Sequence, residues 1–284
     1  MKALKKLTML SLLAVLMVAF TGCDDDDGFP YDNTPPASPR NVNSITGDNR
    51  VDVYWDHNTE SDLLGYNVWR SDSYDGRYIQ LGYTFSEVNY FVDYSARNGV
   101  TYFYGVTAYD NNNNESDLSP EEVFDTPRPE GFGEVVFDFF RYPETAGYDF
   151  SRYDVVEYNS LEADFFFENF EGTLWINVWS DTDIQDMGST IDIYDITWAP
   201  SDGWVQLNPD ENVKYVEAIE GNTYVIWTNN NHYAKIRVKQ LTAERMVFDW
   251  AYQLVDGNRE LKRNDNGETD VIAGSKRVLK KNHK

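Results

Sequence analysis

The chain has 284 residues, with 48 Asp and Glu against 24 Lys and Arg, and a formal net charge of −24 at pH 7. A body this acidic is repelled by polyanions, so we expect no nucleic-acid partner and no electrostatic attraction to anionic lipids. Aromatic residues make up 15% of the sequence, which is typical of chains rich in β-strands, and the length favours more than one domain.

Residues 1–22 have the pattern of a secretory signal peptide. Lys2, Lys5 and Lys6 are followed by an uncharged apolar run from Leu7 to Phe20. This run is about 14 residues long, shorter than the roughly 20 residues that a membrane-spanning helix needs. The sequence therefore predicts a cleaved signal rather than a transmembrane segment.

Cys23 is the only cysteine in the chain, and the small residues Thr21 and Gly22 precede it. A small residue directly before a cysteine resembles the lipobox of bacterial lipoproteins, although Phe20 departs from the usual leucine. The resemblance implies that Cys23 is lipidated with fatty acids such as palmitate and anchors the chain in a membrane. A secreted protein with a free thiol is the alternative.

Four aspartates, Asp24, Asp25, Asp26 and Asp27, follow the cysteine and begin an acidic tether over residues 23–34. An acidic run at this position resembles the surface-export signal of some Gram-negative lipoproteins. The resemblance implies a cell-envelope protein that is anchored in the outer membrane and faces the exterior. Two alternatives remain: a signal for retention at the inner membrane, or a tether kept solvated by its own charge.

Residues 35–127 contain short strands with a period of two, separated by turn residues. Their number and the absence of helical periodicity predict a β-sandwich of seven strands. The alternating residues expected to face the core are Val51, Val53, Trp55, Leu64, Tyr66, Val68, Tyr102, Tyr104, Val106 and Ala108.

The same region resembles a fibronectin type III domain. Trp55 matches the Trp of the second strand, Tyr66 matches the Tyr of the third, and Tyr102 and Tyr104 match the Tyr-x-Tyr strand, which carries the tyrosine-corner residue. The resemblance implies a rigid spacer or docking module. Because a fold does not determine an activity, it implies no particular ligand.

Residues 129–284 follow a Pro-rich linker and again have strand patterns. Ala163, Phe165 and Phe167 share one face, as do Met246, Phe248, Trp250 and Tyr252 in a later strand. Between them, Ala234, Ile236 and Val238 are expected to face inward, and Lys235, Arg237 and Lys239 outward. The whole chain is therefore predicted to be all-β, with a second antiparallel sandwich or open barrel after the first sandwich.

The segment 221–253 resembles the C-terminal half of haemophore-like surface lipoproteins, some of which capture haem. That resemblance would make His232 and Met187 the candidate axial ligands. With so few ligands available, we expect no cofactor and keep haem as an alternative. In the alternative interpretation, His232 is a turn residue and Met187 packs in an ordinary core.

Neither a nucleophile with its base nor a cluster of histidines at metal-ligand spacing is present in the sequence. We therefore expect that the protein is not an enzyme. Because acidic residues are abundant, a pair of glycosidase carboxylates stays open as an alternative.

Glycan binding competes with haem binding as the function of residues 129–284. Trp175 and Trp179 alternate with Leu174, Ile176 and Val178, so two indoles lie on the side of the strand opposite the aliphatic core. Trp227 and Tyr233 are further candidates for ligand contact. The sequence favours a glycan or protein ligand for this region, with a structural docking role that needs no small ligand as the alternative.

Overall fold

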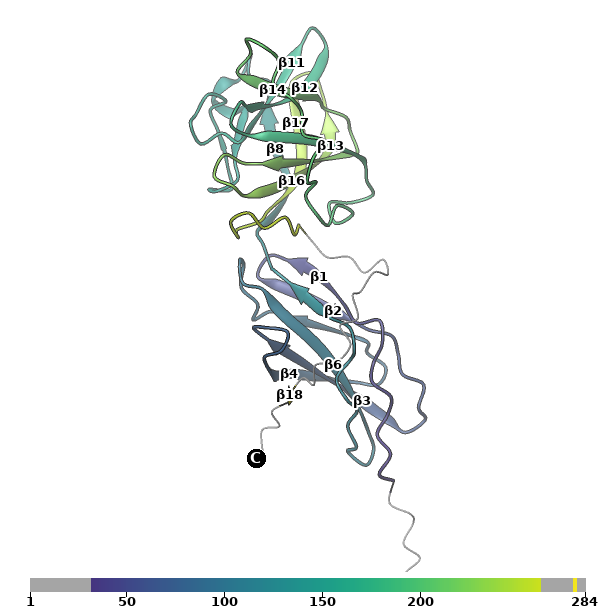
Figure 1. Ribbon diagram of the computed structural model, residues 1–284. Coiled ribbons are helices and arrows are strands. Elements are labelled where there is room, and N and C mark those ends of the chain that lie inside the picture. The colour runs from purple at the N-terminus through teal and green to yellow at the C-terminus, as the bar shows by residue number, and fades with distance from the viewer. Residues whose placement is uncertain (1–31, 262–277, 280–284) are drawn as a thin grey trace, which may run out of the picture. The chain divides into compact units, whose positions relative to one another are not determined.

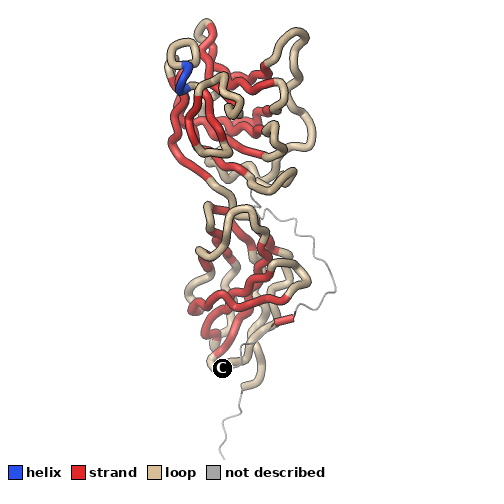
Figure 2. The backbone as a smooth tube through the Cα atoms, turned by 90° about the vertical axis from the view of Figure 1, so that its left-hand side faces the viewer, coloured by secondary structure: helices blue, strands red, loops and turns tan. Residues whose placement is uncertain are grey.

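The computed structural model describes residues 32–261 and the strand residues 278–279. This part of the chain is almost entirely β, and its one helical element is a 3₁₀ turn, η1 (Pro143–Thr145) (Figure 2). The all-β prediction is confirmed. No helix within the described ranges is long and apolar enough to cross a membrane. Cys23 and the aspartates 24–27 lie outside the described residues, as does the predicted signal peptide.

The first seven strands form a fibronectin III-like sandwich of two sheets (Figure 1). One sheet has the order β1 (Asn43–Gly47), β2 (Arg50–Tyr54), β5 (Tyr90–Asp93). The other has the order β4 (Arg77–Phe85), β3 (Leu63–Ser71), β6 (Tyr102–Asp110), β7 (Val123–Asp125). The short strand β18 (Val278–Leu279) pairs in parallel with the free edge of β4.

The core of this sandwich contains the predicted aromatic residues. Trp55 is 2% exposed and meets Tyr66 edge to face, with ring centroids 5.3 Å apart. Tyr104 is fully buried, and its hydroxyl donates a hydrogen bond of 2.9 Å to Asp93. The expectation that Leu64 faces the core is wrong. A bulge at Leu63–Gly65 shifts the alternation, so that Leu63 packs on the core and Leu64 is exposed.

Residues 130–252 form a second sandwich of two five-stranded sheets. The first sheet has the order β10 (Asp154–Val156), β9 (Gly147–Asp149), β11 (Phe165–Phe170), β12 (Thr173–Trp179), β14 (Val213–Glu217). The second has the order β13 (Asp183–Ser189), β15 (Asn222–Trp227), β16 (Tyr233–Leu241), β17 (Arg245–Tyr252), β8 (Glu130–Phe137). All pairings in both sheets are antiparallel, so of the two predicted arrangements the structure has the sandwich.

The two sheets of the second sandwich enclose one hydrophobic core to which both contribute. The predicted inward sets pack there, with Phe165 and Phe167 from β11 and Phe248 and Trp250 from β17. Because these residues alternate along their strands, every second side chain of β11 and β12 is left on the outer face of its sheet. That outer face holds the candidate site.

One predicted outward residue of the second sheet is not solvent-exposed. The side chain of Lys235 points away from the core, as expected. It is nevertheless fully buried, because residues 190–205 cross over the outer face of β16. Its Nζ donates a hydrogen bond of 2.7 Å to the backbone oxygen of Ile196. Arg237 is also outward and half-buried, and it donates to the backbone oxygen of Thr190 at 2.8 Å. The alternation was predicted correctly, but the covering segment was not foreseen.

Candidate functional site

The outer face of β11, β12 and β14 carries aromatic, amide and acidic side chains in register. Glu168 of β11 lies opposite Trp175 of β12. One row further along, Asn177 of β12 lies opposite Tyr215 of β14. Directly paired residues of antiparallel strands have Cβ atoms about 5 Å apart, so these groups form a continuous surface.

An open cavity of about 430 Å³ lies on this face and is lined by Glu168, Phe170, Trp175 and Tyr215. Trp175 and Tyr215 meet edge to face, with centroids 5.3 Å apart and ring planes at 79°. Phe170 is 51% exposed and Tyr215 is 38% exposed, so their rings are available to a ligand. Three aromatic side chains and one carboxylate therefore surround the same space.

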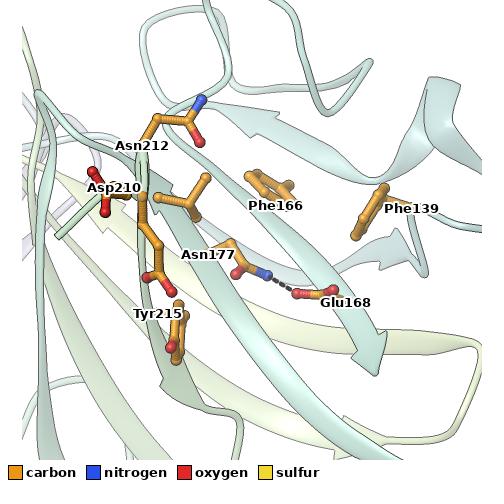
Figure 3. Close-up of a pocket in the computed structure, with 9 residues that line it drawn as sticks. Phe139, Phe166, Glu168, Asn177, Asp210, Asn212 and Tyr215 are labelled. Atoms are coloured by element: carbon orange, nitrogen blue, oxygen red, sulfur yellow. Dashed lines mark hydrogen bonds between the residues drawn. The ribbon is translucent and has the colours of Figure 1, made fainter. Parts of the chain in front are cut away.

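A second cavity of about 350 Å³ adjoins the first, because Glu168 and Tyr215 line both. Figure 3 shows it between Phe139 and Phe166 on one side and the segment 210–213 on the other. The two phenyl rings meet edge to face at 5.5 Å. Asn177 contributes an amide to the floor. We call the two cavities together the outer-face groove, and their volumes lie in the range of small-molecule sites.

Glu168 is the acidic group at the border of the two cavities. Its carboxylate accepts a hydrogen bond of 3.1 Å from the Asn177 amide (Figure 3). Partial burial raises the pKa of Glu168, the Asn177 hydrogen bond opposes that rise, and the nearby charge of Asp138 adds to it. Asn177 is itself 3% exposed, so it fixes the position of the carboxylate.

Of the predicted indoles on β12, only Trp175 lines the groove. Trp179 shares its face, as the alternation predicted, but it packs against Phe166 with centroids 5.4 Å apart. Both residues are half-buried. The two indoles of β12 thus differ in surroundings, because Trp175 lines a cavity and Trp179 packs against Phe166.

Trp227, Tyr233 and Met187 lie in a different place, on the outer face of β13, β15 and β16. The Trp227 and Tyr233 rings stack with centroids 5.5 Å apart at 18°. Met187 packs, further along the same face, against the hydrophobic cluster of Ala199, Val225, Tyr233 and Leu261. Tyr233 is only 5% exposed, and the Trp227 indole N–H donates to Asn231. Trp204, from the covering segment, packs against both rings. These contacts place the three residues in a small hydrophobic cluster.

His232 lies at the turn between β15 and β16. Its Nδ1 is 3.1 Å from the backbone oxygen of Gln253, and its ring packs on Tyr252 with centroids 5.5 Å apart. Met187 lies beside the other end of β15, because its neighbour Asp186 pairs with Tyr224. About five residues of strand, or roughly 15 Å, therefore separate the two predicted haem ligands.

The structure adds groove residues that the sequence interpretation did not name, chiefly Glu168, Phe170 and Tyr215. For β11 a signal was present, because placing Phe165 and Phe167 inward leaves Phe166, Glu168 and Phe170 outward. Tyr215 had no such signal. Its strand follows a long segment rich in Asp, Asn and Pro, and it was not predicted as a strand.

The fold and the groove together define an all-β chain with a fibronectin III-like segment and an aromatic surface site. No family model matches the chain. The amylopullulanase of Thermoanaerobacterium thermosulfurigenes is 36% identical over 99 residues, 34% of this chain and 5% of the relative. That of Thermoanaerobacter thermohydrosulfuricus is 33% identical over 88 residues, 31% of this chain and 6% of the relative. The chain thus spans about a twentieth of the length of these curated relatives.

Among solved structures, a Fn3-like protein from Clostridium thermocellum is 24% identical to this chain, with a TM-score of 0.28. The match covers 34% of this chain and all of that one.

Proposed function

We propose that the protein binds carbohydrate through the outer-face groove and has no catalytic role. The main support for this proposal is that Trp175, Tyr215 and Phe170 surround one open cavity, with amide and carboxylate groups beside them. Aromatic rings offer broad apolar surfaces to the C–H faces of sugar rings, and neighbouring polar groups fix the hydroxyls. The partial match to proteins named amylopullulanases agrees with a role in carbohydrate recognition.

Exposure alone does not distinguish these rings, because other aromatic side chains of the chain, such as Tyr83 and Tyr94, are more exposed. What distinguishes Phe170 and Tyr215 is that they share one open cavity with Trp175. A contiguous apolar patch of this kind is typical of a binding surface.

We further propose that Cys23 anchors the protein in the bacterial cell envelope. The lipobox-like sequence supports the anchor, and the aspartates 24–27 support an outer-membrane position facing the exterior. In this arrangement the fibronectin III-like segment is a spacer between the anchor and the groove. A surface position would bring the groove to polysaccharides outside the cell.

Titration with neutral oligosaccharides, followed by intrinsic tryptophan fluorescence and by calorimetry, tests the proposed function. We expect saturable binding that Trp175→Ala reduces by roughly tenfold or more, because the largest stacking surface is removed. Trp179→Ala is the matched control. It removes an indole from the same strand and face but not from the cavity lining, so it should weaken binding far less. Equal losses in both variants would contradict the assignment of the groove.

A further inference from the structure

The cavity lined by Phe170, Trp175, Tyr215 and Glu168 has the chemistry of a cation-binding cage. The negative faces of aromatic rings attract organic cations, and cages of several aromatic residues bind ammonium groups. Here the Glu168 carboxylate lines the cavity together with three aromatic side chains. The Asn177 amide donates a hydrogen bond of 3.1 Å to that carboxylate and holds it in place. A neutral sugar would use the rings but would leave the charge of Glu168 without a counter-charge.

The charged side chains that line the groove are all acidic. Besides Glu168, the second cavity is lined by Asp210 and Glu211. Among the described residues that line the two cavities, none is Lys or Arg. The chain as a whole carries a formal charge of −24. Uronic acids and sulfated sugars would therefore be repelled, whereas a protonated amine would be attracted.

We propose that the cavity beside Trp175 takes the ammonium group of an amino sugar, so that the ligand is a glycan carrying free amines. This inference rests on the proposed carbohydrate binding and names the chemical class that the groove selects. The ammonium lies against the faces of Trp175 and Tyr215 and forms an ion pair with Glu168. The adjoining cavity, with Phe139, Phe166 and Asn177, holds the next sugar of the chain.

The test compares three oligosaccharides of equal length on the full chain by calorimetry. They are a glucosamine oligomer, its N-acetylated form and a neutral glucose oligomer, measured at a pH that keeps the amine protonated and carboxylates ionised. We expect the amine form to bind roughly five- to thirtyfold more tightly than either neutral form, as a partly desolvated cation–π contact predicts. Raising the salt concentration should reduce this preference.

Two variants assign the preference to one carboxylate. Glu168→Gln keeps the shape of the side chain and removes its charge, so the ratio of amine to neutral affinity should fall close to one. Glu217→Gln is the matched control. It removes an exposed carboxylate of β14 that lies opposite Trp175 but does not line the cavity, so the ratio should persist.

The possible failures are distinct. If neutral oligomers bind in the Trp175-dependent way and the amine form binds no more tightly, the cage inference is overturned and carbohydrate binding stands. If no oligomer binds, both proposals fail. A preference that survives Glu168→Gln would also overturn the inference, because the charge would then act from elsewhere.

Discussion

At the scale of single residues, tryptophan side chains lie in two different environments. The position of each tryptophan in the alternation of its strand decides whether the side chain faces the core or the outer surface. Trp55 is 2% exposed at the centre of the first sandwich. Trp175 lies on the outer face of β12, where its ring lines an open cavity. We therefore expect an indole to stabilise the fold at position 55 and, under the proposed function, to contact the ligand at position 175, and stability measurements separate the two roles.

Trp55→Ala should lower the free energy of unfolding by about 3–5 kcal/mol, because it leaves a cavity in a packed core. Trp175→Ala should cost about 1 kcal/mol or less, because its ring is already partly in water. Urea unfolding monitored by circular dichroism measures both values. A loss under 1 kcal/mol for Trp55→Ala would show that the second strand of the sandwich is wrongly placed.

A second prediction at this scale concerns the pH dependence of stability. Burial raises the pKa of Asp164 to about 7, and the charges of Asp149 and Asp181 add to the rise, while the Phe150 backbone N–H, 2.8 Å away, opposes it. A carboxyl group with a raised pKa binds its proton more tightly in the folded state. Its contribution therefore favours folding more as the pH falls from about 7 to about 4.

Asp164→Asn removes this titration and keeps an oxygen that can accept from Phe150. We expect the variant to gain stability relative to the wild type near pH 8, with the difference shrinking toward pH 5. Carboxylates with lowered pKa values, such as Asp93, lose their contribution only at lower pH and do not disturb this window. Thermal melts of both proteins across the range provide the measurement, and parallel curves would contradict the assignment.

At the scale of elements, period-two patterns predicted inner strands of both sandwiches, such as β3 and β6 in the first and β11, β12, β16 and β17 in the second, because one face of each is buried and the pattern is then visible in the sequence. They did not predict β8, β9, β10, β13 and β14 of the second sandwich. What they could not predict is what covers an outer face. Lys235 has the pattern of a solvated residue, and only the long-range crossing of residues 190–205 buries it. For the same reason, only part of the groove could be predicted from the sequence. Trp175 was identified by its alternation, but its partner Tyr215 is separated from it by 40 residues of chain and was not.

The contacts of β16 predict how the covering segment is held. Lys235→Met keeps the length of the side chain but removes the donor to the Ile196 oxygen, at an expected cost of about 1–3 kcal/mol. Amide hydrogen exchange should then accelerate within residues 190–205 more than in the strands. Lys239→Met is the control, because Lys239 is half exposed and pairs with Asp249 at 3.4 Å, away from this segment. Uniform acceleration across the whole chain would contradict a local clamp.

At the scale of the whole molecule, the charge and the proposed anchor act in opposite directions. A chain of net charge −24 is repelled by anionic lipid surfaces, and salt would screen that repulsion rather than break an attachment. Lipid chains act through the hydrophobic effect, at about 0.8 kcal/mol for each buried CH₂ group. Membrane attachment that persists in high salt would therefore be hydrophobic in origin, as the proposed acyl chains at Cys23 require.

Replacing Cys23 tests this directly. Cys23→Ser should abolish incorporation of labelled palmitate and move the protein from the membrane fraction to the soluble fraction, whereas wild-type protein should stay with membranes through a high-salt wash. Replacing the aspartates 24–27 by serine is the paired variant, because it keeps the cysteine and should leave the palmitate label unchanged. If the acidic run directs export, that variant should lose its sensitivity to protease added to intact cells, which the wild type should show. Equal palmitate label in wild type and Cys23→Ser would rule out the anchor, and a wild type fully protected from protease would rule out the exterior position.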